Sequence, residues 1–558
     1  MIKNGLRFFI FLSLAVSLSF FAGSGLSVYG GSFKILGTRP QGMGGAFVAV
    51  AEGTDAAYWN PAGLGIAAGN FPTGGVALPV GANLEATGGI LNSAKKISDS
   101  ANAIAKIQKA QEDGTSVGLD DLKVFSQAIK NLKEMEGTAR GIQADVTGGI
   151  GVKLKGWSVS VNNFSSVGVN PFVDMSGIYL GSATITSLSF PSQTHYPSLT
   201  KYLVSAEDLA GIDLSKLQTD YSSYFSTASP AGLSSESASL ADSVSTLSNA
   251  AGVKITGYTP EQIANALINI AKSQGVTDED IKNAVSQIGA AIPIIQDFIS
   301  GAKTFKENNS NLSVRGISAT ELVFSHGREL PYFEKAPFLK GVSVGANIKY
   351  VLAQTFYSKQ YFLKGESVEM DDFSNLINKN TAQSSALALD LGLLWRRSDW
   401  IFKPSAGLLA RNLNSPKFSM PTSAQLEGIN DYTLDCQTRG GIALRPFDWW
   451  LIACDLDITD NKTEIDGYNS RNFSVGNEFN IVNKRYFNFA IRSGLIKNLA
   501  FESSPLTYTG GVGINIYGFN LDISGALSSD TVSVPVSATE TREIPSRAML
   551  SLAMSFAF

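Results

Sequence analysis

The sequence predicts an all-β membrane fold, an antiparallel transmembrane β-barrel of about fourteen strands that carries helical insertions. Three observations predict this fold class. Residues 546–558 alternate bulky apolar with small side chains and end at Phe558, as the last strand of a barrel between lipid and lumen does. The first residues have the pattern of a secretion signal. Between the two ends, short alternating segments are joined by connections that are short and long in turn.

The N-terminus predicts export from the cytoplasm. Lys3 and Arg7 precede an apolar run over residues 8–21, and small residues follow it, so residues 1–24 are expected to form a Sec signal peptide that is cleaved near Ser24. A retained membrane anchor is the weaker alternative, because the run is short for a span of about 20 residues. No cysteine lies near the cleavage position, which excludes a lipoprotein.

Composition excludes several classes of protein. The formal charge is −4, and loss of Lys3 and Arg7 with the signal makes it about −6, so a nucleic-acid partner is not expected. Beyond the signal no run of about 18 uncharged apolar residues indicates a membrane helix. Cys436 and Cys454 are predicted on the apolar faces of neighbouring strands, either as lone thiols or as a disulfide.

The barrel is predicted over residues 73–558, with fourteen alternating segments near the length of about 9 to 11 residues that a tilted spanning strand needs. An even number of strands brings both ends of the barrel to the same side of the membrane. The segments are residues 73–89, 144–153, 157–165, 312–326, 341–354, 383–395, 401–412, 435–445, 449–459, 471–479, 486–496, 508–517, 519–527 and 545–558.

The connections predict the orientation of the barrel. Those near residues 397, 446, 483 and 518 are short, whereas those near residues 366, 421, 461, 502 and 534 are long. Bacterial barrels place short turns in the periplasm and long loops outside the cell, so a bacterial outer-membrane location with a periplasmic C-terminus is expected. A further barrel strand over residues 178–190 would make the count odd, so this segment is assigned to an insertion.

Strand faces predict which polar side chains line the lumen. A charge on the lipid face costs about 2 to 4 kcal/mol at the membrane midplane, so charged residues within strands should point inward. The candidate lumen residues are Asp435, Arg439, Asp455 and Asp457. Aromatic residues beside the short turns are expected to form an interfacial girdle. They are Trp395, Trp400, Phe447, Trp449, Trp450, Tyr486, Phe487, Tyr517 and Phe519.

Two insertions interrupt the strands. Helical spacing of apolar residues predicts a helical hairpin over residues 93–136, within an insertion at 93–140. The second insertion, residues 166–311, is Ser-rich early and helical late. Thr259 and Thr277 are expected N-caps of helices that run to about Ser273 and Ser300. Both insertions are expected outside the cell, where they pack on each other, cover the lumen or hold a partner.

The region after the signal contains two unusual motifs. Residues 42–47 read Gly-Met-Gly-Gly-Ala-Phe and residues 59–64 read Trp-Asn-Pro-Ala-Gly-Leu. Dense Gly and Ala allow close backbone packing, and Asn-Pro favours a turn. The two motifs resemble those of the FadL superfamily of outer-membrane barrels, which includes hydrocarbon and fatty-acid transporters and PorV-like secretion components. This resemblance implies that residues 25–72 form a hatch that plugs a fourteen-stranded barrel, with Gly42, Gly44, Gly45, Asn60, Pro61 and Ala62 as its motif.

Two further stretches, residues 407–416 and 453–459, resemble the TraF-type branch of this superfamily, which is named for conjugal transfer. The helical insertions also fit that branch better than a plain fatty-acid transporter. A FadL transporter captures its ligand in an apolar groove of its own extracellular loops, and here an insertion of unmatched sequence replaces that region. No ligand-binding residue therefore carries over beyond the hatch motif.

The sequence offers no catalytic centre, cofactor site or metal site. The two histidines, His195 and His326, lie in no ligand-spaced cluster, and no nucleophile motif accompanies them. Residues 301–304 resemble the end of a phosphate loop, but Gln296 occupies the position of its first glycine. A non-enzymatic function is expected.

Two functions from different classes are predicted. The leading hypothesis is an outer-membrane barrel, in contact with outer-membrane lipid, that takes up or passes a hydrophobic small molecule and is gated by the hatch. The alternative is an assembly or docking component of a secretion or conjugal-transfer system, in which the insertion at 166–311 binds an envelope protein. A purely structural barrel is a third, weaker hypothesis.

Overall fold

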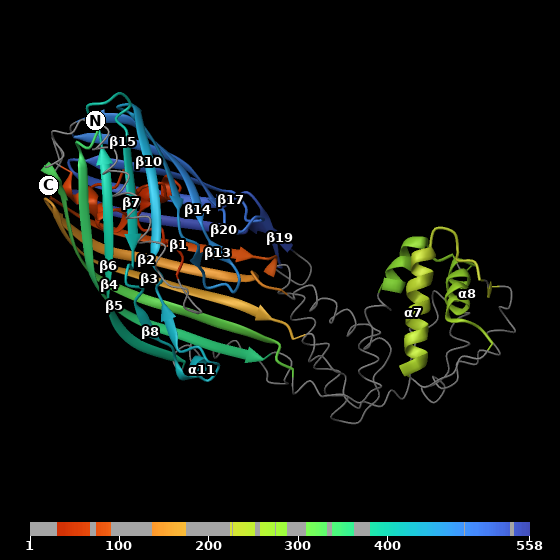
Figure 1. The fold of residues 1–558 in the computed structure, drawn as a ribbon. Helices are drawn as coiled ribbons and strands as arrows, with labels where there is room; N and C mark the ends of the chain where they lie inside the picture. The colour runs from red at the N-terminus through yellow and green to blue at the C-terminus, as the bar shows by residue number, and fades with distance from the viewer. Residues whose placement is uncertain are drawn as a thin grey trace.

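The chain forms one closed antiparallel barrel of fourteen strands (Figure 1). The computed structural model describes residues 31–66, 74–90, 137–174, 224–225, 227–250, 257–273, 275–286, 308–331, 338–361, 380–484, 486–535 and 541–558. Each strand is hydrogen-bonded to the next around the ring, and the last strand pairs with the first, with Ala557 opposite Gly75. The predicted all-β transmembrane barrel of about fourteen strands is confirmed.

The fourteen strands correspond one to one with the predicted segments. In order around the ring they are β1 (Gly74–Thr87), β2 (Gly141–Leu154), β3 (Trp157–Phe172), β4 (Asn311–Glu329), β5 (Val342–Tyr361), β6 (Thr381–Arg396), β7 (Ser405–Arg411), β10 (Gln437–Phe447), β11 (Trp450–Asp457), β14 (Asn472–Lys484), β15 (Phe487–Asn498), β16 (Thr507–Ile516), β17 (Phe519–Ser528) and β20 (Arg547–Ala557).

Several strands are longer than predicted, and β3 and β5 exceed their predicted ranges the most. β3 continues past Ser165 to Phe172, and β5 continues past Gln354 to Tyr361. Polar residues such as Ser166 led the sequence analysis to end β3 too early. The ladder nevertheless persists, because β4 lies between the two strands and pairs with both, Asn311 facing Phe172 on one side and Tyr361 on the other. Backbone pairing therefore extends the wall at the end that carries the long loops.

The two faces of the wall differ as a membrane barrel requires. On β20, Leu550 is 61% exposed, whereas its neighbour Ser551 is 2% exposed. On β11 Leu456 is exposed, whereas Asp455 and Asp457 on either side of it are buried. Apolar side chains thus face outward and polar ones inward, which is the arrangement that lipid demands.

Aromatic rings gather at the end of the barrel that carries the short turns, which we call the short-turn end. Phe447 and Trp449 stack with ring centroids 5.4 Å apart, and Tyr486 and Tyr517 stack at 5.0 Å. Most of these rings are exposed on the outer surface, as side chains at a membrane interface are. The opposite end, with the long connections, is called the long-loop end.

The long connections contain short hairpins. They are β8 (Lys417–Ser419) with β9 (Asp431–Thr433), β12 (Asn461–Lys462) with β13 (Asn469–Ser470), and β18 (Thr531–Pro535) with β19 (Thr541–Pro545). The first hairpin also carries α11 (Thr422–Gln425). These hairpins belong to the connections after β7, β11 and β17.

The second insertion contains a helical unit with its own core. Helices α7 (Ser234–Ala250) and α8 (Pro260–Ser273) pack through Leu240, Ala264 and Ile268. Thr259 caps α8: its hydroxyl accepts a bond from the Gln262 N–H, and the Gln262 side chain accepts one from the Thr259 N–H. The cap and the end of this helix are as predicted. None of the helices in the described part of the chain is long and apolar enough to cross a membrane.

Parts of the insertions predicted from sequence lie outside the described residues. These are the helical hairpin over residues 93–136, the segment 178–190 and the end of the second helix near residue 300.

Residues 31–66 lie inside the ring of strands, and we call this segment the plug (Figure 1). It contains α2 (Thr38–Gly42), η1 (Gly53–Asp55), α3 (Ala56–Trp59) and η2 (Pro61–Gly65). α2 contacts β15, β16, β17 and β20, whereas η2 contacts β4, β5 and β6. The plug therefore touches opposite sides of the wall.

The plug has an aromatic core of its own. The Trp59 ring lies 5.4 Å from Phe33, 5.8 Å from Phe47 and 5.7 Å from Tyr58, measured between ring centroids. The indole N–H of Trp59 donates to the Leu36 carbonyl at 2.8 Å. These contacts join residues from both ends of the plug, so it packs as a single body.

Glycines in the wall make room for the plug backbone. A Cβ added to Gly345 would lie 2.2 Å from the carbonyl carbon of Pro61, and one added to Gly407 would lie 2.6 Å from the Val48 carbonyl oxygen. Such distances leave no room for a side chain. The wall glycines in this position are Gly327, Gly345, Gly392, Gly407, Gly476 and Gly494, on strands β4, β5, β6, β7, β14 and β15.

A methyl group at Gly345 should unseat the plug or strain the wall. We expect Gly345→Ala to destabilise the protein by about 1 to 3 kcal/mol, because the new Cβ overpacks against backbone that cannot rotate away. Gly525→Ala on β17 is the matched control, because its Cβ would have its nearest neighbour at 3.6 Å. Heat-modifiability on gels measures the unfolding midpoint of both variants. Equal midpoints would contradict the steric argument.

Candidate functional site

The glycine motif of the plug is needed by the local backbone. Gly44 and Gly45 have φ angles of +66° and +80°, which side-chain-bearing residues rarely adopt. A Cβ on Gly44 would also lie 2.7 Å from the Leu495 carbonyl oxygen, and one on Gly42 would lie 3.1 Å from the Arg492 Cβ. The motif therefore lets the chain turn while it presses against β15.

The Asn-Pro-Ala motif ties the plug to itself and to the wall. Asn60 is fully buried, and its amide nitrogen donates to the Val48 carbonyl at 3.1 Å and to the Leu393 carbonyl of β6 at 3.0 Å. Its side-chain oxygen accepts a bond from the Ala62 N–H at 3.2 Å, while Pro61 begins η2. A proline at this position loses no helical bond. Every polar atom of the Asn60 side chain is thus used.

Three of the four candidate lumen residues lie together beside the plug. One carboxylate oxygen of Asp455 accepts the N–H groups of Phe47 and Val48, both at 2.8 Å. Arg439 donates to Asp457 at 2.5 Å and to the Gly45 carbonyl at 3.3 Å. The wall therefore binds the plug backbone through side chains on β10 and β11.

The fourth candidate, Asp435, is not brought to this group. It precedes the first residue of β10, Gln437, so the alternation of that strand does not reach it. Its side chain is about one-third exposed and lies 3.8 Å from the Lys462 ammonium. Asp435 therefore belongs to the long-loop end.

The sequence did not predict the ion pairs between plug and wall that the structure shows. Arg39 of α2 makes two bonds to Glu478 of β14, at 2.7 and 2.8 Å. Glu478 also accepts a bond from Arg492 of β15 at 2.8 Å, and Arg39 reaches Glu52 at 2.9 Å. A second pair joins Lys34 of the plug to Asp145 of β2 at 2.7 Å. The partners are far apart in the chain, so no local pattern indicates them.

Burial affects the charge of Asp55, which lies in the plug rather than in a strand. Burial inside the barrel raises the pKa of its carboxyl to about 6, and Arg39 opposes this rise. Asp522 on β17 and Glu52 add to it through like charge. Asp55 therefore holds its proton to a higher pH than an ordinary aspartate.

A second charged group lines the lumen farther along the wall. The Lys349 ammonium lies 2.9 Å from Asp390 and 3.3 Å from Glu321. Arg411 lies 3.4 Å from Glu321 and covers the Tyr58 ring of the plug, with its guanidinium carbon 4.0 Å from the ring centroid. These residues come from β4, β5, β6 and β7 and have little contact with solvent.

Two cavities lie between plug and wall. The first leaves about 630 Å³ free of protein atoms, including space open to solvent, and its lining is mostly polar, with Lys34, Asn83, Asp145 and Asn472. The second leaves about 460 Å³ free of protein atoms, again including space open to solvent. Its lining combines apolar and aromatic residues with polar ones and with three charged ones, Lys34, Glu321 and Arg411. The apolar and aromatic residues include Tyr58, Phe164, Ile317, Ala319 and Leu434.

The remaining residues considered from the sequence are the two cysteines and the two histidines. Cys436 and Cys454 are both free thiols. His326 stacks on Trp157 with ring centroids 4.0 Å apart at the short-turn end, and His195 lies outside the described residues. Within the described ranges, no group of three or more His, Cys, Asp or Glu residues is placed to hold a metal ion.

The fold defines a class, the closed transmembrane β-barrel, and in this chain residues from the N-terminal side contact the inside of the wall. Residues 57–457 match the model of the family described as the F plasmid transfer operon TraF protein, and the chain belongs to this family. The predicted resemblance to the TraF-type branch is thereby confirmed. Comparison with curated proteins finds no match to this sequence.

Solved barrels are similar to this chain. The toluene transporter TbuX of Ralstonia pickettii is 10% identical, with 94% of this chain and 98% of that chain covered and a TM-score of 0.36. The toluene transporter TodX of Pseudomonas putida is 9% identical, with coverages of 95% and 99% and a TM-score of 0.36. A FadL homologue of Pseudomonas aeruginosa is 8% identical, with coverages of 95% and 100% and a TM-score of 0.38.

Removal of Arg39 should loosen the plug. We expect Arg39→Ala to weaken the seating of the plug by about 3 kcal/mol, because Glu478 loses one of two partners in a buried setting. Faster hydrogen exchange of the amides in residues 43–50 would report this loss. Arg471→Ala is the matched control, because its pair with Asp460 is exposed and such pairs contribute about 0 to 1 kcal/mol. Equal exchange in both variants would refute the anchoring role.

Proposed function

We propose that this protein is a barrel of the bacterial outer membrane through which a small molecule passes when the plug rearranges. The observation that carries the proposal is the way the plug is held. Its aromatic side chains pack on one another and on a few apolar wall residues such as Phe164 and Leu451. Its other contacts with the wall are ion pairs and bonds to backbone groups. Charges released from these polar contacts regain water, so this part of the interface opens at lower cost than an apolar core of the same size. The short-turn end is then periplasmic and the long-loop end extracellular.

The second cavity supports a hydrophobic molecule as the substrate. Phe164, Ile317 and Leu434 supply apolar surface next to the plug, and Tyr58 of the plug closes one side. A small apolar molecule in this cavity would contact both the wall and the plug. If the molecule binds one position of the plug more tightly than another, its presence shifts the plug toward the position that it binds better.

Deletion of residues 42–64 should raise the ion conductance of the barrel in planar lipid bilayers, because this deletion removes most of the plug. The rise should be clearest when the connection between β11 and β14 is shortened as well, since Glu464 of this connection bonds to Arg315 of β4 across the lumen. Heat-modifiability must show that the wall still folds. If conductance does not rise in either form, the plug is not the barrier and the proposal fails.

An alternative function, docking in a secretion or conjugal-transfer assembly, has one observation in its favour. The helical unit of α7 and α8 has its own apolar core within the long insertion. The description of the family also names a plasmid transfer operon. An insertion that folds as a unit can bind a partner without changing the barrel.

Native mass spectrometry of the barrel purified from outer membranes separates the two functions. We expect a co-purifying hydrophobic molecule, released when Ile317→Asp places a charge in the second cavity. A stoichiometric envelope protein on an otherwise empty barrel would instead favour docking. Loss of that protein on deletion of residues 227–286 would assign the contact to the helical unit.

A further inference from the structure

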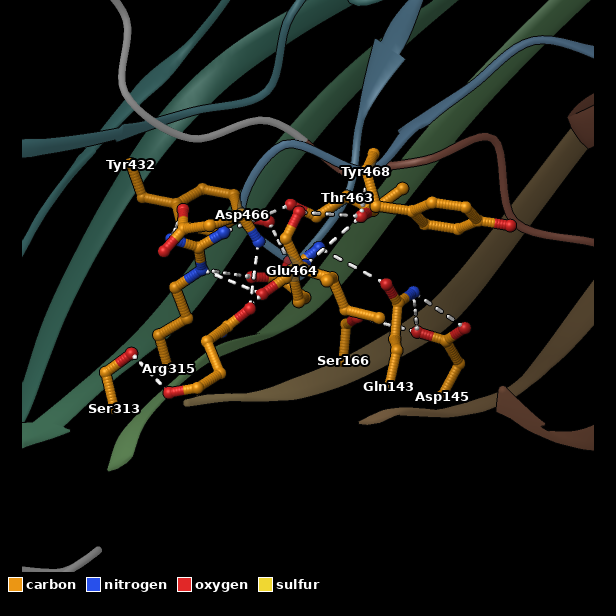
Figure 2. A network of polar contacts seen from close by, with 12 residues as sticks. Gln143, Asp145, Ser166, Ser313, Arg315, Tyr432, Thr463, Glu464, Asp466 and Tyr468 are labelled. Atoms are coloured by element: carbon orange, nitrogen blue, oxygen red, sulfur yellow. Dashed lines mark hydrogen bonds and ion pairs between the residues drawn. The ribbon is translucent and has the colours of Figure 1, made fainter. Parts of the chain in front are cut away.

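The connection between β11 and β14 crosses the lumen at the long-loop end, and we call residues 458–471 the strap. In the strand order, β2 and β3 lie seven places from β11 and β14 in a ring of fourteen, on the opposite wall. Yet Glu464 and Asp466 of the strap are bonded to side chains of β2, β3 and β4. Figure 2 shows these contacts converging on Glu464. The strap therefore spans the full width of the barrel.

The bonds to the far wall are numerous and well formed. The Glu464 carbonyl accepts from Arg315 Nε and from Asn170 Nδ2, both at 2.9 Å. The Asp466 N–H donates to Asn170 at 2.8 Å, and the Asp466 carboxylate lies 2.5 Å from Arg315. Gln143 of β2 accepts the Glu464 N–H at 3.2 Å. These bonds hold the strap at three adjacent strands.

The wall is shaped to receive the strap. A Cβ added to Gly168 of β3 would lie 2.3 Å from the Glu464 carbonyl oxygen. One added to Gly141 of β2 would lie 2.5 Å from the Val169 carbonyl oxygen of β3 and 3.1 Å from the Ile465 side chain. Glu464 and Ile465 are each 1% exposed. Close backbone approach of this kind matches the way the plug sits against the wall farther down the lumen.

The first cavity separates the strap from the plug. Thr463, Tyr468 and Ser470 of the strap line it together with Lys34 and Gln41 of the plug. Tyr468 also donates to Glu85 of β1 at 2.7 Å. The lumen is thus obstructed at two levels, with a polar chamber between them.

The residues that hold the strap lie at the base of the long insertion. Asn170 is near the end of β3, and Arg315 is near the start of β4, the two strands that the insertion joins. The base itself is tied together, since Phe172 pairs with Asn311 and the Asp174 N–H donates to Ser310 at 2.8 Å. Movement of the insertion would therefore act on the two side chains that anchor the strap.

We propose that the strap is a second gate at the long-loop end, latched by Asn170 and Arg315 at the base of the insertion. The inference rests on the proposed function, since a gate has meaning only in a barrel that passes a molecule. The strap and the plug act in series, so each limits passage and the lumen opens fully only when both have moved. The alternative role for the strap is a brace that stiffens the rim without controlling passage.

Four forms of the full-length protein test the proposal in planar bilayers with potassium chloride. They are the wild type, the deletion of residues 42–64, a strap in which a short Gly-Ser turn replaces residues 460–470, and the combination. A short turn can join β11 to β14 because Leu456 and Phe473 are already paired. We expect the combined variant to conduct several-fold more than the sum of the two single variants, as two barriers in series require.

The outcomes separate the two proposals. Equal conductance of the plug deletion and the combined variant would overturn the strap as a gate while leaving the plug as the barrier. Equal conductance of the shortened strap and the combined variant would overturn the proposed function instead. A brace would lower the unfolding midpoint of the barrel and leave conductance unchanged in both plug backgrounds, which also overturns the gate.

A point variant guards against misfolding of the shortened strap. Arg315→Gln keeps the length of the strap and removes the charge that holds Asp466, so in the plug deletion it should raise conductance several-fold. Arg328→Gln, at an exposed position toward the other end of β4, is the matched control and should have no effect. An unchanged conductance in Arg315→Gln would count against the latch.

Discussion

Closure of the strand ring is the constraint on which the rest of the structure depends. Within lipid every backbone N–H and C=O must find a partner inside the protein, and pairing of β1 with β20 leaves no open edge. A ring of fourteen strands encloses a lumen too wide for the inward side chains alone to fill. The charged residues of the strands point inward because the outer face must be apolar, so this lumen contains charges such as Asp455 and Glu478. Something polar has to occupy it, either water or chain.

The plug meets this demand with backbone as much as with side chains. Asp455 takes two plug N–H groups, Asn60 reaches a wall carbonyl, and wall glycines allow the chain to approach. Buried charges such as Glu478 are compensated by arginines from both plug and wall. Buried ion pairs add little net stability, but a charge left without a partner is costly. Such contacts therefore fix where the plug sits more than how tightly it is held.

Much of the fold could be predicted because alternation and connection length are local properties of the sequence. The alternation of apolar and polar residues predicted the position of every strand and the inward direction of Asp455 and Asp457. It failed at the end of β3, where polar residues such as Ser166 continue the ladder. The partners of Arg39 and Arg315 could not be predicted, because Glu478 and Asp466 lie far away in the chain and only the closed ring brings them near.

The role of the wall glycines could not be predicted from the sequence either. A glycine within a strand weakens it and has no local explanation. Gly345 and Gly168 are explained only once the plug and the strap are seen against them. The residue that marks a binding surface is here the one that lacks a side chain, so a search for chemically distinctive residues passes over it.

Passage and docking need not be rival functions once the strap is considered. Asn170 and Arg315 belong to the strands from which the long insertion leaves the barrel, and both hold the strap. A partner that binds the insertion and displaces this base would free one side of the strap. With the plug still in its place, that event would open the chamber at one end only. An insertion that binds a partner would thus determine when the outer end of the barrel opens, and the plug would determine whether anything crosses.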